Sequence, residues 1–188
     1  RALLLPVISA SVGSMQVARF DFEQRVDALI KEPLQLVDPF DEVGVPTFNL
    51  SYQEHNNRDL LAKLSDMYLA ACPSLEFVAP HCADPPLLNA LTPLRIGFVS
   101  RFFQSNSVGR CFHGILRYPN RADVEVTAFT FAAGQDPLWK AIEGDVANTV
   151  ILPAHLEAAR QRIAEEALDV LVYTDIGMDP LTYYLAYS

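Results

Sequence analysis

Hydrophobic residues along this chain follow two different rhythms, and the change falls near residue 90. In residues 11–34 and 57–73 the apolar positions recur every three or four residues, which predicts two amphipathic helices. The stretch that follows, residues 80–93, is rich in proline and is typical of a linker. We therefore expect residues 1–90 to form a helical lead-in and linker.

From residue 91 onward the pattern alternates between strands and helices. Short runs of β-branched and aromatic residues predict strands that are covered on both faces, at residues 94–100, 124–131, 149–153 and 169–176. Helical patterns fill the intervals, and in the last of them we expect Arg160 and Arg162 to face solvent. This repetition predicts an α/β fold, with a Rossmann-like doubly wound parallel sheet in residues 91–188.

The final residues, "DPLTYYLAYS", have the pattern of a helix without a stop signal. We therefore expect the second domain to be truncated at its C-terminus and the chain to be a piece of a longer protein.

The composition is that of an ordinary globular protein. Of the 188 residues, 51% are hydrophobic and 20% are charged, which provides enough apolar surface for a sizeable core. The formal net charge of −9 argues against nucleic acid as the partner, because phosphate binding needs a basic face. We also expect no membrane span, since no apolar run approaches the roughly 18–20 residues that one requires.

The cysteines favour a reducing compartment. Cys72, Cys82 and Cys111 are odd in number and widely spaced, which suits free thiols better than a disulfide framework. His81 beside Cys82 suggests a metal ligand pair, but the C-x-x-C spacing of structural zinc sites is missing. We expect a cytoplasmic protein without a metal site.

Two phosphate-binding motifs that often occur in such folds are absent from the sequence. The loop after the first strand, "SRFFQSNSVGR", contains a single glycine, Gly109, where a dinucleotide fingerprint would read G-x-G-x-x-G. No G-x-x-x-x-G-K-[ST] loop is present either. We therefore expect neither a nicotinamide or flavin cofactor nor nucleoside triphosphatase activity.

The same loop nevertheless carries polar side chains at the start of a helix. Ser105, Asn106 and Ser107 come directly before Val108 and Gly109. Backbone N–H groups at a helix N-terminus attract anions such as a diphosphate. The alternative is an ordinary helix cap that binds no ligand.

A second polar loop follows the fourth strand. Asp175 and Asp179 flank Gly177, and Pro180 stands at a favoured first position of the next helix. Both loops leave the carboxyl ends of parallel strands, so they should converge on one crevice. A carboxylate there could position a hydroxyl group or act as a base. Alternatively, Asp179 serves only as an N-cap.

The two loops together resemble a known family. "TPLRIGFVSRFFQSNSVGRCFHGIL" and "DVLVYTDIGMDPLTYYLAYS" resemble the catalytic region of the O-linked N-acetylglucosaminyltransferase family, and are most similar to its SPINDLY-like branch. The segment "VPTFNLSYQEHNNRDLLAKLSDMYLAACPSLEFVAPHC" resembles the stretch that leads into that region. The resemblance covers most of residues 45–188.

The resemblance implies the first of two Rossmann-like halves of a glycosyltransferase. Such an enzyme transfers N-acetylglucosamine or a related sugar, such as glucose or fucose, to Ser or Thr of intracellular proteins. The expected donor is a UDP-linked nucleotide sugar. It needs no metal or other cofactor, and the missing C-terminal catalytic half grips most of the donor. The two loops and this resemblance together make Asn106 and Asp175 the candidate catalytic residues. The candidate substrate-binding residues are Ser105, Ser107, Gly109, Arg110, Gly177, Met178 and Asp179.

One position departs from the family pattern. Family members usually carry a histidine in the first loop where this chain has Asn106, and an amide cannot accept a proton near neutral pH. Either another group such as Asp175 is the base, or the chain is a weak or inactive relative that binds proteins or nucleotide sugars. A third alternative is an unrelated doubly wound binding module.

Overall fold

The computed structural model describes residues 3–44, 47–83, 92–132 and 134–188. The chain divides into two compact units, residues 1–76 and residues 77–188. The domain boundary predicted near residue 90 lies outside the described residues.

The first unit is helical. Its elements are α1 (Val12–Lys31), α2 (Pro39–Glu42), the 3-10 helix η1 (Phe48–Gln53), α3 (Arg58–Ala71) and the 3-10 helix η2 (Pro73–Leu75). The two long helices, α1 and α3, are those that the sequence pattern predicts. Ser11 is the N-cap of α1, and a capping box joins it to Ser14. The helix ends at Lys31, just before Pro33.

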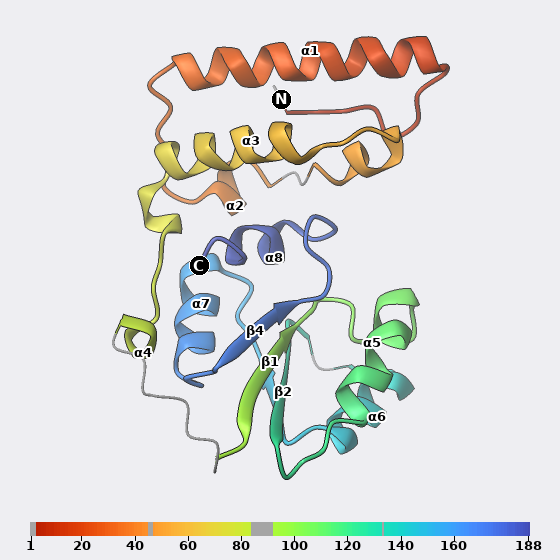
Figure 1. The fold of residues 1–188 in the computed structure, drawn as a ribbon, viewed down its shortest axis with the longest axis vertical. Coiled ribbons are helices and arrows are strands. Elements are labelled where there is room, and N and C mark those ends of the chain that lie inside the picture. The colour runs from red at the N-terminus through yellow and green to blue at the C-terminus, as the bar shows by residue number, and fades with distance from the viewer. Residues whose placement is uncertain (1–2, 45–46, 84–91, 133) are drawn as a thin grey trace. The chain divides into compact units, whose positions relative to one another are not determined.

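Helices α1 and α3 lie side by side and contact each other (Figure 1). Phe22 and Val26 of α1 and Leu64 of α3 are completely buried. The spacing of these residues, about one helical turn apart, gives each helix a single apolar stripe to bury. On the exposed side the ammonium group of Lys63 lies 2.7 Å from the carboxylate of Asp27.

The second unit is an α/β domain, as predicted. Its elements are α4 (Pro80–Ala83), β1 (Leu94–Val99), α5 (Ser107–Arg117), β2 (Val124–Thr130), α6 (Pro137–Asp145), β3 (Asn148–Ile151), α7 (Leu156–Ala164), β4 (Val170–Tyr173) and α8 (Pro180–Leu185). The four strands are all parallel and lie in the order β3-β2-β1-β4. The prediction of a Rossmann-like doubly wound sheet is therefore confirmed.

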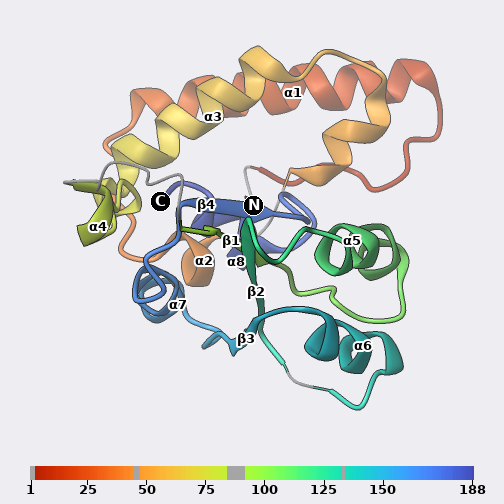
Figure 2. The ribbon, with the colours of Figure 1, turned by 60° about the horizontal axis from the view of Figure 1, so that its bottom comes forward.

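The sheet is covered by helices on both faces. In the register, Ile96 of β1 pairs with Val126 of β2 on one side and with Val170 of β4 on the other. Figure 2 shows α5 and α6 side by side on one face of the sheet and α7 on the opposite face. Strands in such a sheet are buried on both faces, which explains why their sequences are almost continuously apolar.

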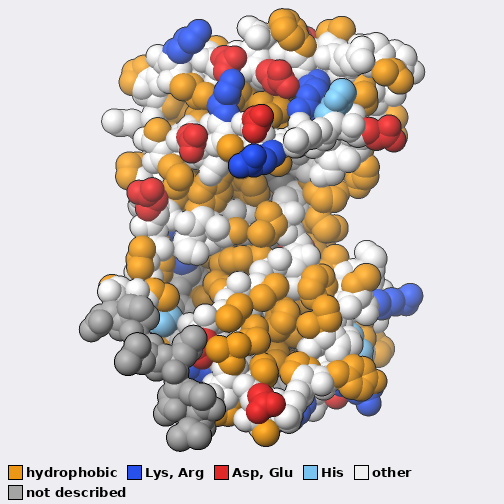
Figure 3. Space-filling model, viewed as in Figure 1, with side chains coloured by type: hydrophobic (Ala, Val, Ile, Leu, Met, Phe, Trp, Pro, Cys, Tyr) orange, Lys and Arg blue, Asp and Glu red, His pale blue; other side chains and the backbone are white. Residues whose placement is uncertain are grey.

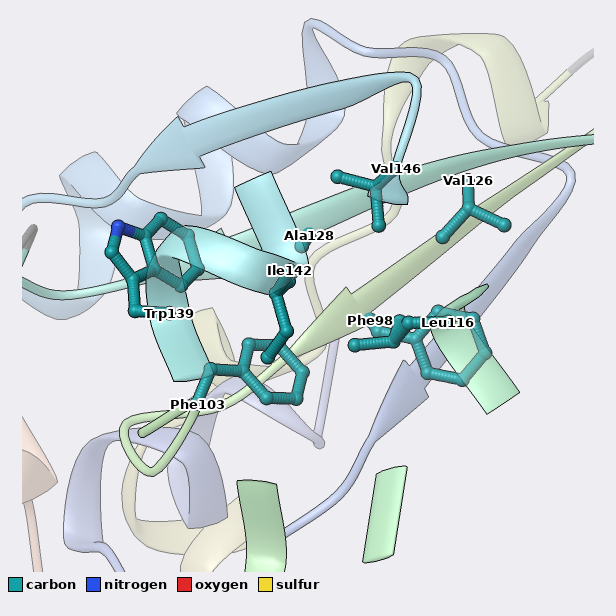
Figure 4. Packing of buried hydrophobic residues seen from close by; sticks show 8 residues of the cluster. All are labelled: Phe98, Phe103, Leu116, Val126, Ala128, Trp139, Ile142 and Val146. Carbon is teal, nitrogen blue, oxygen red and sulfur yellow. The ribbon is translucent and has the colours of Figure 1, made fainter. Parts of the chain in front are cut away.

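The core of this unit lies between the sheet and helices α5 and α6. Figure 4 shows the side chain of Ile142 of α6 pointing toward the ring of Phe103, and Phe98 close to Leu116; Trp139 of α6 belongs to the same cluster. These side chains are almost fully buried. Because the core extends to Phe103, it anchors the loop that follows β1.

One predicted exposure is wrong. Arg162 pairs with Glu165 and Glu166 at the surface, as expected of an amphipathic helix, but Arg160 is 8% exposed. The guanidinium group of Arg160 lies over the ring of Phe77, 5.2 Å from its centre, and also pairs with Glu157. A periodicity argument misses this burial because Phe77 belongs to a segment far away in the sequence.

The hydrophobic character of the helices and of the surface completes the description of the fold. No helix in the described part of the chain is both long and apolar enough to cross a membrane. In the second unit, Figure 3 shows hydrophobic side chains gathered over the face that contains β4 and β1. Val170 of β4 is 40% exposed, and β4 is an edge strand of the described sheet.

Candidate functional site

The candidate site lies where β1 and β4 end. From β1 the sheet extends in one direction through β2 to β3, and the chain then returns to place β4 on the other side of β1. Such a reversal opens a crevice at the carboxyl ends of the two diverging strands, which is where α/β proteins bind ligands. The two polar loops predicted from the sequence, within residues 100–110 and at residues 175–179, lie at this edge (Figure 1). In the structure they run over residues 100–106 and 174–179.

Asp175 joins the two loops. Its Oδ2 accepts hydrogen bonds from the backbone N–H of Arg101 (3.1 Å) and from the hydroxyl of Ser100 (3.4 Å). Its Oδ1 is buried and has no hydrogen-bond partner among the described residues. Burial raises the pKa of Asp175 to about 6; the hydrogen bonds from Arg101 and Ser100 limit the rise, and the charge of Asp179 adds to it.

A tight turn presents the Asp175 carboxylate at this edge. The backbone N–H of Met178 donates to the carbonyl of Asp175 (3.0 Å), and Gly177 has a φ of 84°. This left-handed conformation favours glycine because a Cβ atom there would be strained. The structure therefore assigns Gly177 a role in shaping the turn, while the Met178 side chain is 40% exposed.

Asp179 has both carboxylate oxygens engaged. Its Oδ1 caps α8 by accepting from the backbone N–H groups of Leu181 (3.0 Å) and Thr182 (3.1 Å). Its Oδ2 lies 2.6 Å from Nε of Arg101. Asp179 is therefore the helix cap that one interpretation of the sequence expected, and it also holds an arginine of the first loop.

Sequence reasoning did not select Arg101. Its guanidinium group pairs with Asp179 and lies over the ring of Phe131, 4.9 Å from the ring centre. The available signal was its position, because Arg101 follows the buried strand β1 after one serine. Its partners lie in two other loops, after β2 and β4, and no local pattern in the sequence reveals them.

Asn106 is the N-cap of α5. Its side-chain oxygen accepts a hydrogen bond from the backbone N–H of Gly109 (3.1 Å). Gly109 packs so closely on the preceding loop that a Cβ atom would lie 2.1 Å from the carbonyl oxygen of Gln104. Of the two alternatives that the sequence left open, anion binding or an ordinary cap, the N–H of Gly109 serves the cap.

The other predicted residues of the first loop lie around this cap. The hydroxyl of Ser105 donates to Asp136 (3.0 Å), which caps α6. Burial acts to raise the pKa of Asp136, but hydrogen bonds from Ser105 and the α6 backbone outweigh it and hold this pKa below its usual value. Ser107 and Arg110 are exposed on the first turn of α5.

The structure thus divides the predicted residues between two neighbouring groups. Asp175 and Asp179 are linked through Arg101 at the ends of β1 and β4. Asn106 and Ser105 are linked instead to α5 and to Asp136. Within the described residues, no hydrogen bond joins Asn106 to Asp175.

Comparison with known proteins identifies the fold. No family model matches the chain, and no curated protein matches it. Among solved structures, a mutant form of the O-GlcNAc transferase of Thermobaculum terrenum matches with a TM-score of 0.58 and 17% sequence identity. The match covers 94% of this chain and 31% of that one, so the chain spans about a third of the length of the enzyme that it resembles.

The α/β unit therefore has the fold of a Rossmann-like glycosyltransferase lobe. More particularly, the fold of the chain is similar to that of an O-GlcNAc transferase. At 17% identity this likeness concerns the fold alone.

Proposed function

We propose that this chain is the first half of the catalytic region of a glycosyltransferase, and that Asp175 is its general base. The enzyme transfers N-acetylglucosamine or a related sugar from a nucleotide-sugar donor to a Ser or Thr hydroxyl of an acceptor protein. The observation that carries the proposal is the buried carboxylate of Asp175 at the carboxyl ends of β1 and β4, in a fold like that of an O-GlcNAc transferase. One of its oxygens has no hydrogen-bond partner among the described residues.

The proposed reaction needs only a base and a leaving diphosphate. Oδ1 of Asp175 takes the proton of the acceptor hydroxyl while the hydroxyl oxygen attacks the anomeric carbon of the sugar. The bond between that carbon and the diphosphate oxygen breaks, and the nucleoside diphosphate leaves. A pKa of about 6 suits this role, because Asp175 is then ionised at neutral pH and still basic enough to accept a proton. The proposed transfer uses no metal or other cofactor.

The test is a transfer assay on the full-length protein that contains this chain, with radiolabelled nucleotide sugars and peptide acceptors. We expect Asp175→Asn to lower kcat about 10²–10⁴-fold, because an amide cannot take the proton. The kcat/KM of the wild type should fall as pH decreases through about 6, since Asp175 then becomes protonated.

The matched control is Asp169→Asn, at the opposite end of β4, where the carboxylate accepts a backbone N–H from Arg95 (2.8 Å). It should retain the wild-type rate. If the full-length protein shows neither sugar transfer nor donor hydrolysis, the proposed activity is wrong.

The second candidate is a catalytically weak or inactive relative that binds a protein or a nucleotide sugar. Asn106 favours it, because its side chain caps α5 and offers no group that accepts a proton. Restoring the family residue with Asn106→His distinguishes the two. A large gain in turnover would indicate a decayed enzyme, whereas an unchanged rate in an active wild type would agree with Asp175 as the base.

The proposal also includes a second half that is not part of this chain and that supplies most of the donor contacts. Residues 1–188 alone should therefore bind uridine diphosphate only weakly. Tight binding of uridine diphosphate to residues 1–188 in a calorimeter would contradict this part of the proposal.

A further inference from the structure

Arg101 is held in place on two sides. Its Nε lies 2.6 Å from Oδ2 of Asp179, whose other oxygen is fixed by the first turn of α8. The face of its guanidinium group rests on the ring of Phe131. Both contacts restrict the rotation of a side chain that would otherwise lose considerable entropy on binding a ligand.

The outer edge of the same guanidinium group is open. Nε is buried and meets Asp179 as an ion pair, without a hydrogen bond to any described residue. Neither terminal nitrogen is buried or hydrogen-bonded among the described residues, and the side chain is 38% exposed. The two terminal nitrogens of an arginine present parallel N–H groups. These match two oxygens of a phosphate or carboxylate in a bidentate arrangement.

Arg101 is also the one cation of these loops. The segments that follow the four strands, residues 100–106, 131–136, 152–155 and 174–179, contain no other Lys or Arg. The backbone N–H of Arg101 donates to Oδ2 of Asp175, whose other oxygen, Oδ1, is buried and has no partner among the described residues. At the carboxyl ends of β1 and β4 the structure thus combines a buried carboxylate oxygen that has no partner with an arginine whose terminal nitrogens are free to bind. Together they indicate a place where a polar ligand binds.

We propose that Arg101 binds a phosphate group of the nucleotide-sugar donor through its two terminal nitrogens, with Asp179 and Phe131 holding it in position. The identity of the anion rests on the proposed function, since the donor proposed above carries a diphosphate. Arg101 then offsets the negative charge that the diphosphate gains as its bond to the sugar breaks.

The test measures binding of inorganic pyrophosphate and of uridine diphosphate to the full-length protein by isothermal titration calorimetry. Arg101→Gln should weaken both about 10- to 100-fold, the usual effect of removing hydrogen bonds from a charged group. Arg101→Lys keeps the charge but loses the paired N–H groups, so its affinity for both probes should lie between those of Arg101→Gln and the wild type.

Two further variants separate a specific contact from general electrostatics. Asp179→Asn keeps an oxygen that can cap α8 but removes the charge that fixes Arg101, so it should weaken binding several-fold. Arg117→Gln is the matched control, because Arg117 also pairs with an aspartate and lies over an aromatic ring, but far from this edge of the sheet. It should bind as wild type does.

The proposal is overturned if folded Arg101→Gln binds both probes with the wild-type Kd, or if the wild type binds neither. An equal loss in Arg117→Gln, or an effect of Arg101→Gln confined to the KM of the acceptor peptide, also overturns it. The transfer assay of the wild type is a separate readout. If the wild type transfers sugar but Arg101→Gln binds both probes unchanged, only the inference about Arg101 is wrong. If probe binding depends on Arg101 but the wild type transfers no sugar, only the proposed function is wrong.

Discussion

At the scale of single residues, the burial of Asp175 has the clearest energetic consequence. The side chain is 2% exposed, and one of its oxygens lacks a partner among the described residues. Taking a charged carboxylate out of water is costly, which is why burial raises its pKa to about 6. A raised pKa of an acid means that the folded state binds the proton more tightly than the unfolded state does.

The free energy of unfolding should therefore depend on pH through Asp175. Its contribution is fully present below the unfolded pKa of about 4 and is lost as pH rises through about 6. Asp175→Asn, which cannot ionise, should be more stable than wild type by about 1–3 kcal/mol at pH 8, and this advantage should disappear at pH 4. Urea unfolding at both pH values measures the difference, and an advantage of equal size at both would contradict the assignment.

At the scale of elements, the start of α5 depends on one close approach. Asn106 caps the helix through the N–H of Gly109, and the backbone of Gln104 folds back over the same residue. Only a glycine leaves room for this contact, since a Cβ atom would overlap the carbonyl oxygen of Gln104. Further along the same helix, a Cβ atom at Gly114 would meet nothing within 4 Å.

These two glycines predict opposite results for the same substitution. Gly109→Ala should destabilise the protein by at least about 2 kcal/mol, because backbone rather than a flexible side chain must move. Gly114→Ala should stabilise it by up to about 1 kcal/mol, because alanine loses less backbone entropy in a helix. Thermal unfolding of the two variants compares them directly, and a neutral Gly109→Ala would show that the loop before α5 is not fixed by this contact.

At the scale of the whole molecule, the edge of the sheet at β4 stands out in the α/β unit. A cavity of about 290 Å³ with mainly apolar walls lies beside it, lined in part by Phe77, Ile163 and Leu171. Val170 lines the same cavity and is 40% exposed. An apolar edge strand of this kind is prone to pair with other chains.

We expect Val170→Lys to reduce self-association of residues 1–188 at high concentration, because a charge on an edge strand opposes pairing. Its effect on the free energy of unfolding should stay below about 1 kcal/mol, since the side chain is already part-exposed. Sedimentation velocity measures the association. Ile151→Lys, on the opposite edge strand β3, is the matched control and should reduce self-association less. Equal reductions in the two variants would indicate a general effect of charge.

Much of the fold follows from local patterns, and so could be predicted. The Ser11 cap and Pro33 bracket α1, and the strand–helix alternation after residue 91 predicts the parallel sheet that is observed. Part of the site was predictable as well, because the carboxyl ends of parallel strands share an edge. The positions of Asp175 and Asp179 at that edge follow from the pattern alone.

The sequence pattern did not determine which residues each side chain contacts. Sequence reasoning offered Asp179 as a cap or a ligand-binding residue and did not select Arg101 at all. Their ion pair joins residues separated by 78 positions that approach only because β4 is placed beside β1. The burial of Arg160 was mispredicted for the same reason, since its ring partner Phe77 is remote in sequence.

The sequence by itself therefore determined the elements, their order and the edge at which the polar loops collect, because these depend on periodicity and on capping within a few residues. Only the tertiary structure decided which oxygen of Asp175 lacks a hydrogen-bond partner and which arginine is both ion-paired and exposed. It also decided that the side chain of Asn106 caps a helix. Such properties depend on desolvation and on contacts between strands, and neither has a counterpart in local sequence.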